Sequence, residues 1–420
     1  MSAGPLTPLS DEQRQHFTWL DRSALKKVVA ALEKAAPGAA RFVGGCVRDS
    51  LLGVPPKDFD IATPLTPERV VAALDAADLR SAPTGLAHGT VTAIADGTGV
   101  EVTTLRRDVS TDGRRATVAF TDDWAEDARR RDFRLNAIYL GPDGFLFDPV
   151  GGVADAAAGR VRFIGDPRER IREDYLRILR FFRFSARIAA SFDSDGLAAC
   201  HDERAGVAGL SAERVGAEFL QILALARASD AAEEMARAGV LDEIWPGGDI
   251  AVLQRIKEMA PSAPGVIALA GLYGVIGGEK DAGLARRLRL SNADKARASA
   301  ANAAAERIGA EKVHGELSPL QIRVLGYRHG IEGARDGALL AAARSVIDAG
   351  ERASIDAVFE GWRPPALPVS GRDILAAGVA AGPAVAAILR AVEERWLGED
   401  FPDAARAQAI LGEEVARSRG

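Results

Sequence analysis

The chain has 420 residues, 47% of them apolar, which is enough for two to four domains and an ordinary composition for a soluble globular protein. No apolar run approaches membrane-spanning length and the first residues lack a secretory pattern, so the sequence predicts a cytoplasmic protein with no membrane partner. The net charge of −6 does not indicate general nucleic-acid binding, and the two cysteines, Cys46 and Cys200, exclude a disulfide framework and a thiolate zinc site.

Short β-branched segments alternate with helices and turns up to about residue 160. Apolar periodicity predicts helices at 23–36 and 67–77. The expected strands are 41–45, 89–95, 99–106, 115–120 and 135–140. The second and third of these strands would pair through the turn DGTG, and the last two would extend the same sheet. The pattern predicts an N-terminal α+β domain.

Strand signals fade after residue 160, and the rest of the chain predicts helices broken by Gly, Pro and Asn. Residues 361–373 have the composition of a linker before the last helices. Residues 160–187 carry nine arginines against four acids. That surplus would suit a phosphate backbone, but the arginine-rich composition of the whole chain explains it as well.

The segment Asp58-Phe59-Asp60 places two carboxylates two residues apart. On a strand such residues point to the same face, and Phe59 would turn into the core. Two close carboxylates repel unless a cation lies between them, and Mg²⁺ suits carboxylates together with substrate phosphates. Two such ions ~4 Å apart can serve phosphoryl transfer. A solvated turn is the alternative, because the flanking sequence PPKDFD is polar.

Gly44 and Gly45 precede this segment, where a predicted strand ends and a predicted helix begins. Backbone without side chains approaches phosphates closely, and helix N-termini favour anions. Arg48, in the first turn of that helix, would reach the same phosphates. Glu101 alternates correctly to supply a third carboxylate, although an ordinary exposed strand glutamate fits equally well. Together these residues indicate a nucleotidyltransferase.

A second polar cluster, RRRDFRLNAIYL, abuts an apolar segment. Arg131 would bind a triphosphate. Asp132 and Asn136 would fix a turn or contact a ribose.

A third cluster recurs every three residues along one side of a predicted helix at 172–187. Its members are Asp174, Arg177, Arg180 and Arg183. Asp174 and Arg177 lie one turn apart and are expected to pair. A carboxylate held beside a guanidinium offers the donors and acceptors that a base edge requires. A charged surface face is the alternative.

Four segments resemble, in order, the motifs of class II tRNA nucleotidyltransferases, which are the CCA-adding enzymes and their relatives the bacterial poly(A) polymerases. The segments are GGCVRDSLLG…KDFD, RRDFRLNA, DPVGG…D and EDYLRILRFFRF. LSAERV (210–215) resembles the family's next helical motif. The resemblance implies a polymerase-β-like α+β head (1–160) followed by an all-helical neck (161–228), body (229–360) and tail (361–420), with tRNA contacts in the tail.

The resemblance also implies site roles. Mg²⁺ would bind Asp58 and Asp60, and phosphates would contact Gly45, Arg48 and Arg131. Asp174 and Arg177 would select the base, with Arg180 and Arg183 in support.

Residues 105–120 resemble the flexible loop that CCA-adding members need to switch from C to A. Its charges would be Asp112, Arg114 and Arg115. Two positions depart from the family pattern: Arg134 stands where Thr is usual, and Ser110 lies near the place of a usual Tyr.

The predicted function is addition of CCA to tRNA from CTP and ATP with release of pyrophosphate. A poly(A) polymerase of the same family is one alternative, but residues 61–77 lack the basic, aromatic and histidine-containing segment of those relatives. Partial enzymes that add only CC or only A are a second alternative. A non-catalytic tRNA-binding protein would not require the carboxylates, and the long helical half argues against a small-molecule substrate.

Overall fold

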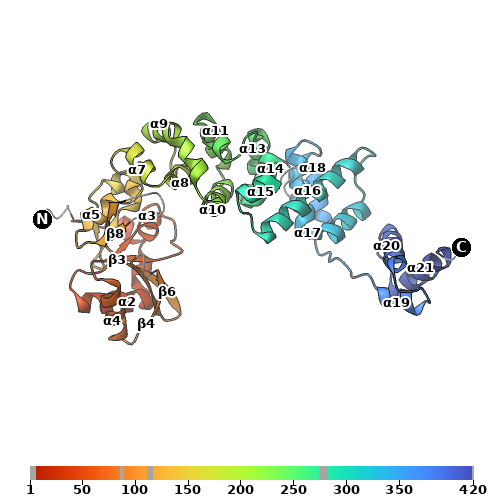
Figure 1. Cartoon of the computed structure of the whole chain (residues 1–420), viewed down its shortest axis with the longest axis horizontal. Coiled ribbons are helices and arrows are strands. Elements are labelled where there is room, and N and C mark those ends of the chain that lie inside the picture. Colours follow the sequence, from red (N-terminus) through yellow and green to blue (C-terminus); the bar gives the residue numbers. More distant parts are fainter. Residues whose placement is uncertain (1–5, 86–88, 111–116, 275–281, 419–420) are drawn as a thin grey trace. The chain divides into compact units, whose positions relative to one another are not determined.

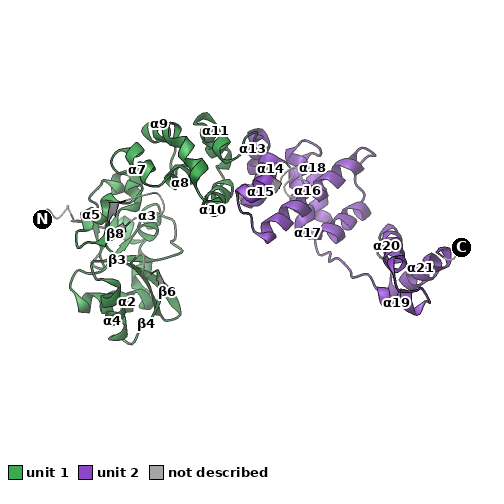
Figure 2. Ribbon diagram, in the orientation of Figure 1, with its two compact units in different colours: residues 1–247 green, residues 248–420 purple. Residues whose placement is uncertain are grey.

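The computed structural model describes residues 6–85, 89–110, 117–274 and 282–418 (Figure 1). They form two compact units, residues 1–247 and 248–420 (Figure 2). Within the described residues, no helix is both long enough and apolar enough to cross a membrane. The division into head, neck, body and tail stays a prediction.

The first unit contains an eight-stranded sheet. In spatial order its strands are β1 (Leu6–Pro8), β10 (Phe145–Phe147), β9 (Tyr139–Leu140), β2 (Arg41–Val43), β3 (Asp60–Thr63), β6 (Thr98–Thr104), β5 (Thr90–Ala95) and β4 (Arg80–Gly85). Strands β3 and β6 are parallel, and the other neighbours are antiparallel. The expected hairpin of 89–95 and 99–106 is confirmed as β5 and β6, and the α+β fold of this region is confirmed.

The two faces of the sheet pack against different clusters. Helices α2 (Ser23–Ala35) and α4 (Pro67–Asp75) contact β5, whose alternating buried residues face them. Phe59 and Ile61 belong to this cluster, whereas Ala62 belongs to a second cluster with Tyr139. Because side chains alternate along a strand, Asp60 projects to the face of Ala62.

Two strand predictions differ from the structure. Strand β8 (Thr117–Phe120) pairs with β7 (Arg106–Ser110) in a separate two-stranded sheet, so the expectation that 115–120 extends the main sheet is wrong. The chain leaves β6 through the buried Leu105, whose N–H still bonds Thr63 O (2.7 Å), and the hairpin continues beyond the sheet. Of 135–140, only β9 is strand, because residues 134–136 form a 3₁₀ turn.

The remaining helices of the first unit surround this sheet or follow it. They are α1 (Asp11–Arg14), α3 (Gly45–Leu51), α5 (Trp124–Arg129), α6 (Gly152–Ala157), α7 (Pro167–Glu173), α8 (Leu176–Ile188), α9 (Ser194–Glu203), α10 (Ala212–Leu223), α11 (Ala228–Arg237) and α12 (Val240–Ile244). The single helix expected at 172–187 is interrupted at Asp174, whose backbone is extended (φ −158, ψ 104). Asp174 therefore lies between two helices.

The second unit is helical wherever regular structure is described. Its helices are α13 (Ile250–Met259), α14 (Gly265–Tyr273), α15 (Ala282–Arg287), α16 (Asn292–Lys312), α17 (Pro319–Ala343), α18 (Ala349–Val358), α19 (Gly371–Ala376), α20 (Pro383–Gly398) and α21 (Ala404–Arg417). The prediction that helices follow the α+β region is confirmed.

Helix α17 is broken at Gly330 (φ 74, ψ 154) and belongs to two cores. Before the break, Val324 and Tyr327 pack against the cluster of α19, α20 and α21. After it, Gly337 lies so close to α16 that an added Cβ would come within 2.5 Å of the Ala304 Cβ atom. The break lets one helix serve both cores, because a positive φ with this ψ is open essentially to glycine alone.

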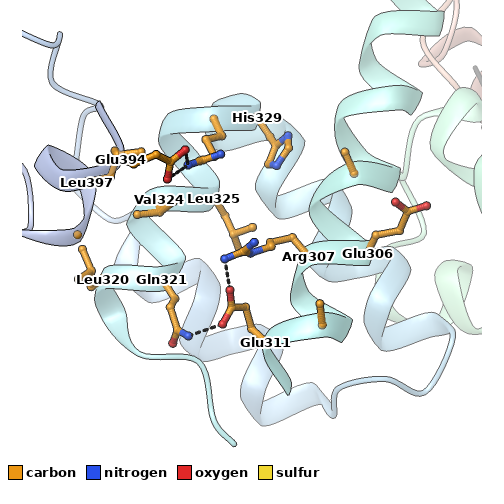
Figure 3. Close-up of a pocket in the computed structure, with 14 residues that line it drawn as sticks. Glu306, Arg307, Glu311, Leu320, Gln321, Val324, Leu325, His329, Glu394 and Leu397 are labelled. Carbon is orange, nitrogen blue, oxygen red and sulfur yellow. Dashed lines mark hydrogen bonds and ion pairs between the residues drawn. The ribbon is translucent and has the colours of Figure 1, made fainter. Parts of the chain in front are cut away.

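A pocket of about 580 Å³ lies between α16, the first half of α17 and α20 (Figure 3). Apolar side chains such as Leu325 and Leu397 line it together with charged ones. Arg307 pairs with Glu311, which also accepts a bond from Gln321 (2.7 Å). The pocket is therefore a mixed apolar and polar space whose Arg307 charge is compensated.

Candidate active site

Asp60 opens β3, and its Cα partner across the parallel pair is Glu101 of β6. Asp58 precedes the strand in a bend, while Phe59 is buried against Trp19 with ring centroids 5.1 Å apart. Burial raises the pKa of Asp60, as do the charges of Glu101 and Asp58, and although Arg131 opposes them the pKa reaches about 6. The charges of Asp58 and Glu101 thus disfavour ionisation of Asp60, and the role of the three carboxylates at a metal site stays a prediction.

The donor set at β3 fits a hard divalent cation that also takes oxygen ligands from a substrate. Mg²⁺ is usually bound by one or two carboxylates with waters and phosphates. No group of three or more His, Cys, Asp or Glu side chains in the described part of the chain is arranged to hold a metal by itself. Asp58 and Asp60 would thus supply only part of a coordination shell.

Gly44 lies between the carboxylate of Asp60 and the guanidinium of Arg131. It follows the last residue of β2 and is the N-cap of α3, with φ 74 and ψ −126. A Cβ added to Gly44 would lie 3.9 Å from both Arg131 Nη1 and Asp60 Oδ2. The positive φ favours glycine, whereas an added Cβ would make only ordinary van der Waals contacts with the two charged groups.

Arg131 is anchored by residues that the sequence reasoning missed. Its Nε and Nη2 donate to Asp127 Oδ2 (3.3 and 3.2 Å), and Tyr139 donates its hydroxyl proton to the same oxygen (2.6 Å). Arg130 donates to Asp127 Oδ1 (2.7 Å), as does the Arg106 backbone N–H (3.1 Å). Asp127 and Arg131 are four residues apart in the sequence, and this spacing could have predicted the ion pair.

The pKa of Asp127 reflects this anchoring. Burial alone would raise it, but Arg131, Arg130 and the Tyr139 hydroxyl outweigh burial and lower the pKa to about 2. Asp127 is therefore an ionised, buried counter-charge for two arginines.

Arg48 lies inside the fold rather than on a surface. It is 5% exposed; its Nε donates to Asp49 (2.8 Å) and its Nη1 to Asn136 Oδ1 (2.6 Å). Asp49 also accepts from Arg187 of α8 (2.9 Å). Burial lowers the pKa of Arg48, although Asp49 opposes that effect. The structure thus gives Arg48 protein partners, and its contact with phosphate stays a prediction.

Asp132 and Asn136 fix the turn between them. Asp132 Oδ1 accepts from Asn136 Nδ2 (2.9 Å) and from the Phe133 N–H (2.8 Å). Its Oδ2 accepts from Arg180 Nε of α8 (2.8 Å). Arg183 donates to Glu218 of α10 (2.6 Å), a residue that the sequence reasoning did not single out. Arg180 and Arg183 therefore hold neighbouring elements together.

The expected pair of Asp174 and Arg177 is not formed. Arg177 donates to Glu173 Oε2 (2.5 Å), to Arg170 O (2.8 Å) and to Arg130 O (3.2 Å). Asp174 accepts instead from Arg214 Nη2 (2.6 Å). Because the helix breaks at Asp174, the one-turn geometry that the prediction assumed is lost, and each side chain takes another partner.

The loop residues Asp112, Arg114 and Arg115 lie outside the described residues, so the structure does not bear on them. Of the other predicted residues, the structure brings Gly44, Asp60 and Arg131 together where β2 ends and β3 begins, with Glu101 opposite Asp60 on β6. Such a set suits an attack on a phosphate with a metal ion bound.

Comparisons with known proteins agree with this chemistry. Residues 40–162 match a family model described as the poly A polymerase head domain. The Mus musculus protein named CCA tRNA nucleotidyltransferase 1, mitochondrial, is 36% identical over 366 residues, which cover 85% of this chain and 82% of that protein. The CCA-adding enzyme of Lacticaseibacillus paracasei is 38% identical over 208 residues, covering 49% of this chain and 51% of that one.

Solved structures show the same fold along almost the whole chain. The Bacillus stearothermophilus CCA-adding enzyme in complex with CTP has a TM-score of 0.74 at 27% identity and covers 95% of this chain and 99% of that one. The Thermotoga maritima CCA-adding enzyme complexed with tRNA has a TM-score of 0.66 at 17% identity, covering 99% of this chain and 100% of that one. The second likeness concerns the fold alone.

Proposed function

We propose that this chain, which belongs to the family of CCA tRNA nucleotidyltransferases and bacterial poly(A) polymerases, adds C, C and A to the 3′ ends of tRNA from CTP and ATP. Similarity to a CCA tRNA nucleotidyltransferase over most of both chains supports tRNA as the substrate. The observation that carries the proposal is Asp60, a carboxylate opposite Glu101 on the strand pair and beside the glycine that adjoins Arg131.

The reaction joins the tRNA 3′ oxygen to the α-phosphorus of the incoming nucleotide. The bond from that phosphorus to the oxygen bridging toward the β-phosphate breaks, pyrophosphate leaves with the electron pair, and the hydroxyl proton is released. Asp58 and Asp60 would hold Mg²⁺, which when bound activates the hydroxyl and neutralises phosphate charge. Glu101 is the candidate third carboxylate.

The phosphate side of the site would be Gly44, Gly45 and Arg131. Asp127 orients the Arg131 guanidinium, so that arginine need not be reorganised when the triphosphate arrives. Arg48, Asp132 and Asn136 would support the same wall through their mutual bonds.

Base selection would fall to Asp174 and Arg177. Cytosine and adenine both present an amino donor where uracil and guanine present a carbonyl acceptor. A carboxylate that accepts from the amino group therefore favours C and A together, and Arg177 would donate to a ring nitrogen. Arg180 and Arg183 support the helix that carries Arg177.

Poly(A) synthesis is the alternative within the family, and α4 with its flanks lacks the basic and aromatic segment expected of it. The cytoplasm is proposed as the compartment from the sequence pattern, whereas the mouse relative is named as mitochondrial.

The test uses purified protein, Mg²⁺ and tRNA transcripts ending at the discriminator base, at C or at CC. CTP and ATP are supplied separately and together, and the products are sequenced. We expect the protein to add C, C and A in that order to tRNA and to leave unrelated RNA unextended. Long A tails on unrelated RNA would instead identify a poly(A) polymerase, and no incorporation would identify a non-catalytic binder.

A further inference from the structure

Tyr139 is a fully buried residue of β9 that the mechanism above does not use. Its partner across the strand pair is Val43, the residue before Gly44. We propose that Tyr139 is a positioning residue, whose hydroxyl group fixes the plane of the Arg131 guanidinium and directs Nη1 of that arginine toward the phosphates of the incoming nucleotide. This inference rests on the proposed function and adds a residue to its phosphate side.

Asp127 alone does not fix the plane of the Arg131 guanidinium. Nε and Nη2 of Arg131 both donate to Asp127 Oδ2 (3.3 and 3.2 Å). Asp127 Oδ1 accepts instead from Arg130 (2.7 Å) and from the Arg106 N–H (3.1 Å). An arginine is oriented most strongly when two of its nitrogens meet the two oxygens of one carboxylate, because the parallel bonds define a plane. With one carboxylate oxygen as its acceptor, the guanidinium can still pivot about that oxygen.

The Tyr139 hydroxyl supplies a second fixed point for the guanidinium. Its oxygen accepts from Arg131 Nε (3.2 Å), and its proton is donated to Asp127 Oδ2 (2.6 Å). A hydroxyl has one proton and two acceptor sites, so both bonds can form at once. Burial raises the pKa of Tyr139 and outweighs the opposing charge of Arg131, so the hydroxyl keeps its proton at neutral pH.

The aromatic ring that carries this hydroxyl is itself held by packing. Trp124 meets it edge-on, with ring centroids 5.6 Å apart and planes at 83°, and the ring of Phe147 lies 6.0 Å away. Trp124 is also the first residue of α5, the helix that carries Asp127. The hydroxyl and the carboxylate that it bonds are therefore placed by one set of contacts.

Nη1 is the guanidinium nitrogen that remains for the substrate. Among the described residues it has no hydrogen-bond acceptor, whereas Nε and Nη2 are both bonded. A Cβ added to Gly44 would lie 3.9 Å from Nη1 and 3.9 Å from Asp60 Oδ2, so Nη1 lies beside the glycine turn. The Arg131 side chain is 20% exposed, which lets a phosphate oxygen reach it. A pivot about Asp127 Oδ2 would displace Nη1 from this position.

The experiment compares Tyr139→Phe, which keeps the ring and removes the hydroxyl, with the wild type. Kinetics are measured for CTP and UTP on tRNA ending at the discriminator base and for ATP on tRNA ending in CC, together with inhibition by inorganic pyrophosphate. We expect the KM for CTP and for ATP to rise about tenfold, because a hydrogen bond to a charged group is lost on each side of the hydroxyl. Pyrophosphate should inhibit more weakly by a similar factor. The ratio of kcat/KM for CTP to that for UTP should not change, because both nucleotides carry the same triphosphate.

Two further variants separate the two bonds of the hydroxyl. In para-aminophenylalanine at position 139, the amino group still donates to Asp127, but its lone pair is delocalised into the ring and accepts poorly from Arg131. The KM should therefore rise as it does in Tyr139→Phe. In an Arg131→Lys background, Tyr139→Phe should raise the KM no further, because no guanidinium remains to be oriented.

Tyr327→Phe is the matched control. The Tyr327 hydroxyl also donates to a carboxylate, that of Glu393 (2.9 Å), but it lies in the second unit. Its loss should leave the KM for CTP and for ATP unchanged.

A wild-type KM in Tyr139→Phe would overturn the inference, and so would a lower kcat at unchanged KM, which indicates a purely structural role. A further rise of the KM in the double variant would overturn it as well. If Tyr139→Phe does not fold, the para-aminophenylalanine variant decides, and a wild-type KM in that variant overturns the inference. Failure of the wild type to incorporate C and A is a separate result, which would overturn the proposed function instead.

Discussion

Replacing Asp127 with Asn should lower the free energy of unfolding and weaken nucleotide binding. Asp127 is 1% exposed and accepts bonds from Arg130, Arg131, Tyr139 and the Arg106 backbone. Asparagine keeps the shape but removes the charge and turns one acceptor into a donor. Two buried or half-buried arginines then lose their counter-charge.

The magnitude follows from two estimates. Lowering a carboxyl pKa from 3.8 to about 2 contributes about 2 kcal/mol to the free energy of unfolding at neutral pH. Removing one partner of a buried ion pair costs about 3–5 kcal/mol, because the other charge stays buried. We therefore expect Asp127→Asn to lose about 2–5 kcal/mol at pH 7.

The pH dependence has a definite sign. The folded-state pKa of Asp127 is depressed, so its contribution is complete above pH 3.8 and is lost as the pH falls toward 2. The stability gap between wild type and Asp127→Asn should be equal at pH 7 and pH 5 and smaller at pH 3. Urea unfolding followed by circular dichroism measures it at each pH.

Glu126→Gln is the matched control, since Glu126 adjoins Asp127 in α5 but is 34% exposed and accepts from Thr121. We expect the KM for CTP to rise in Asp127→Asn and not in Glu126→Gln. A stability gap below about 0.5 kcal/mol at pH 7, the range of ordinary surface substitutions, would refute the assignment of Asp127 as the counter-charge.

The remaining predictions concern the metal ligands and two glycines. Asp58→Ala and Asp60→Ala should each abolish nucleotide incorporation and leave tRNA affinity in a filter-binding assay unchanged; incorporation at wild-type rates would exclude them as metal ligands. Gly44→Ala should lower the free energy of unfolding by about 1–3 kcal/mol, because the backbone φ of Gly44 is 74. It should also raise the KM for CTP, because Gly44 lies between Asp60 and Arg131. Gly330→Ala should destabilise the protein by a similar ~1–3 kcal/mol, measured by thermal unfolding. The control Gly398→Ala should not destabilise it, because no atom lies within 4 Å of the added Cβ. Equal effects of the two substitutions would argue against backbone strain at Gly330.

The positions of Asp60 and Glu101 were predictable because they follow from the alternation of side chains along a single strand. Phe59 is fully buried and Asp60 is half-buried, as expected when side chains alternate along a strand. Glu101 was found in the same way, since strand periodicity placed it on one face and the parallel register put it opposite Asp60.

The partners of the arginines were less predictable. Periodicity suggested that Asp174 and Arg177 would bond each other, but the backbone at Asp174 is extended and Arg214 lies closer to its carboxylate. Glu218 similarly meets Arg183 from a helix 35 residues later. Which of several cations a carboxylate meets depends on tertiary packing, and residue spacing carries little information on it.

Helix α17 has a practical consequence for dissecting this protein. A chain ended at residue 360 would keep Val324 and Tyr327 but lose Trp396 and Phe401, the aromatic rings that Tyr327 contacts at 5.7 and 5.8 Å. Such a fragment would present a bare apolar stripe to water and would tend to aggregate. A fragment that contains the core of α19, α20 and α21 has to include residues 319–329 as well. A designed linker would have to join residue 329 to the start of that C-terminal segment.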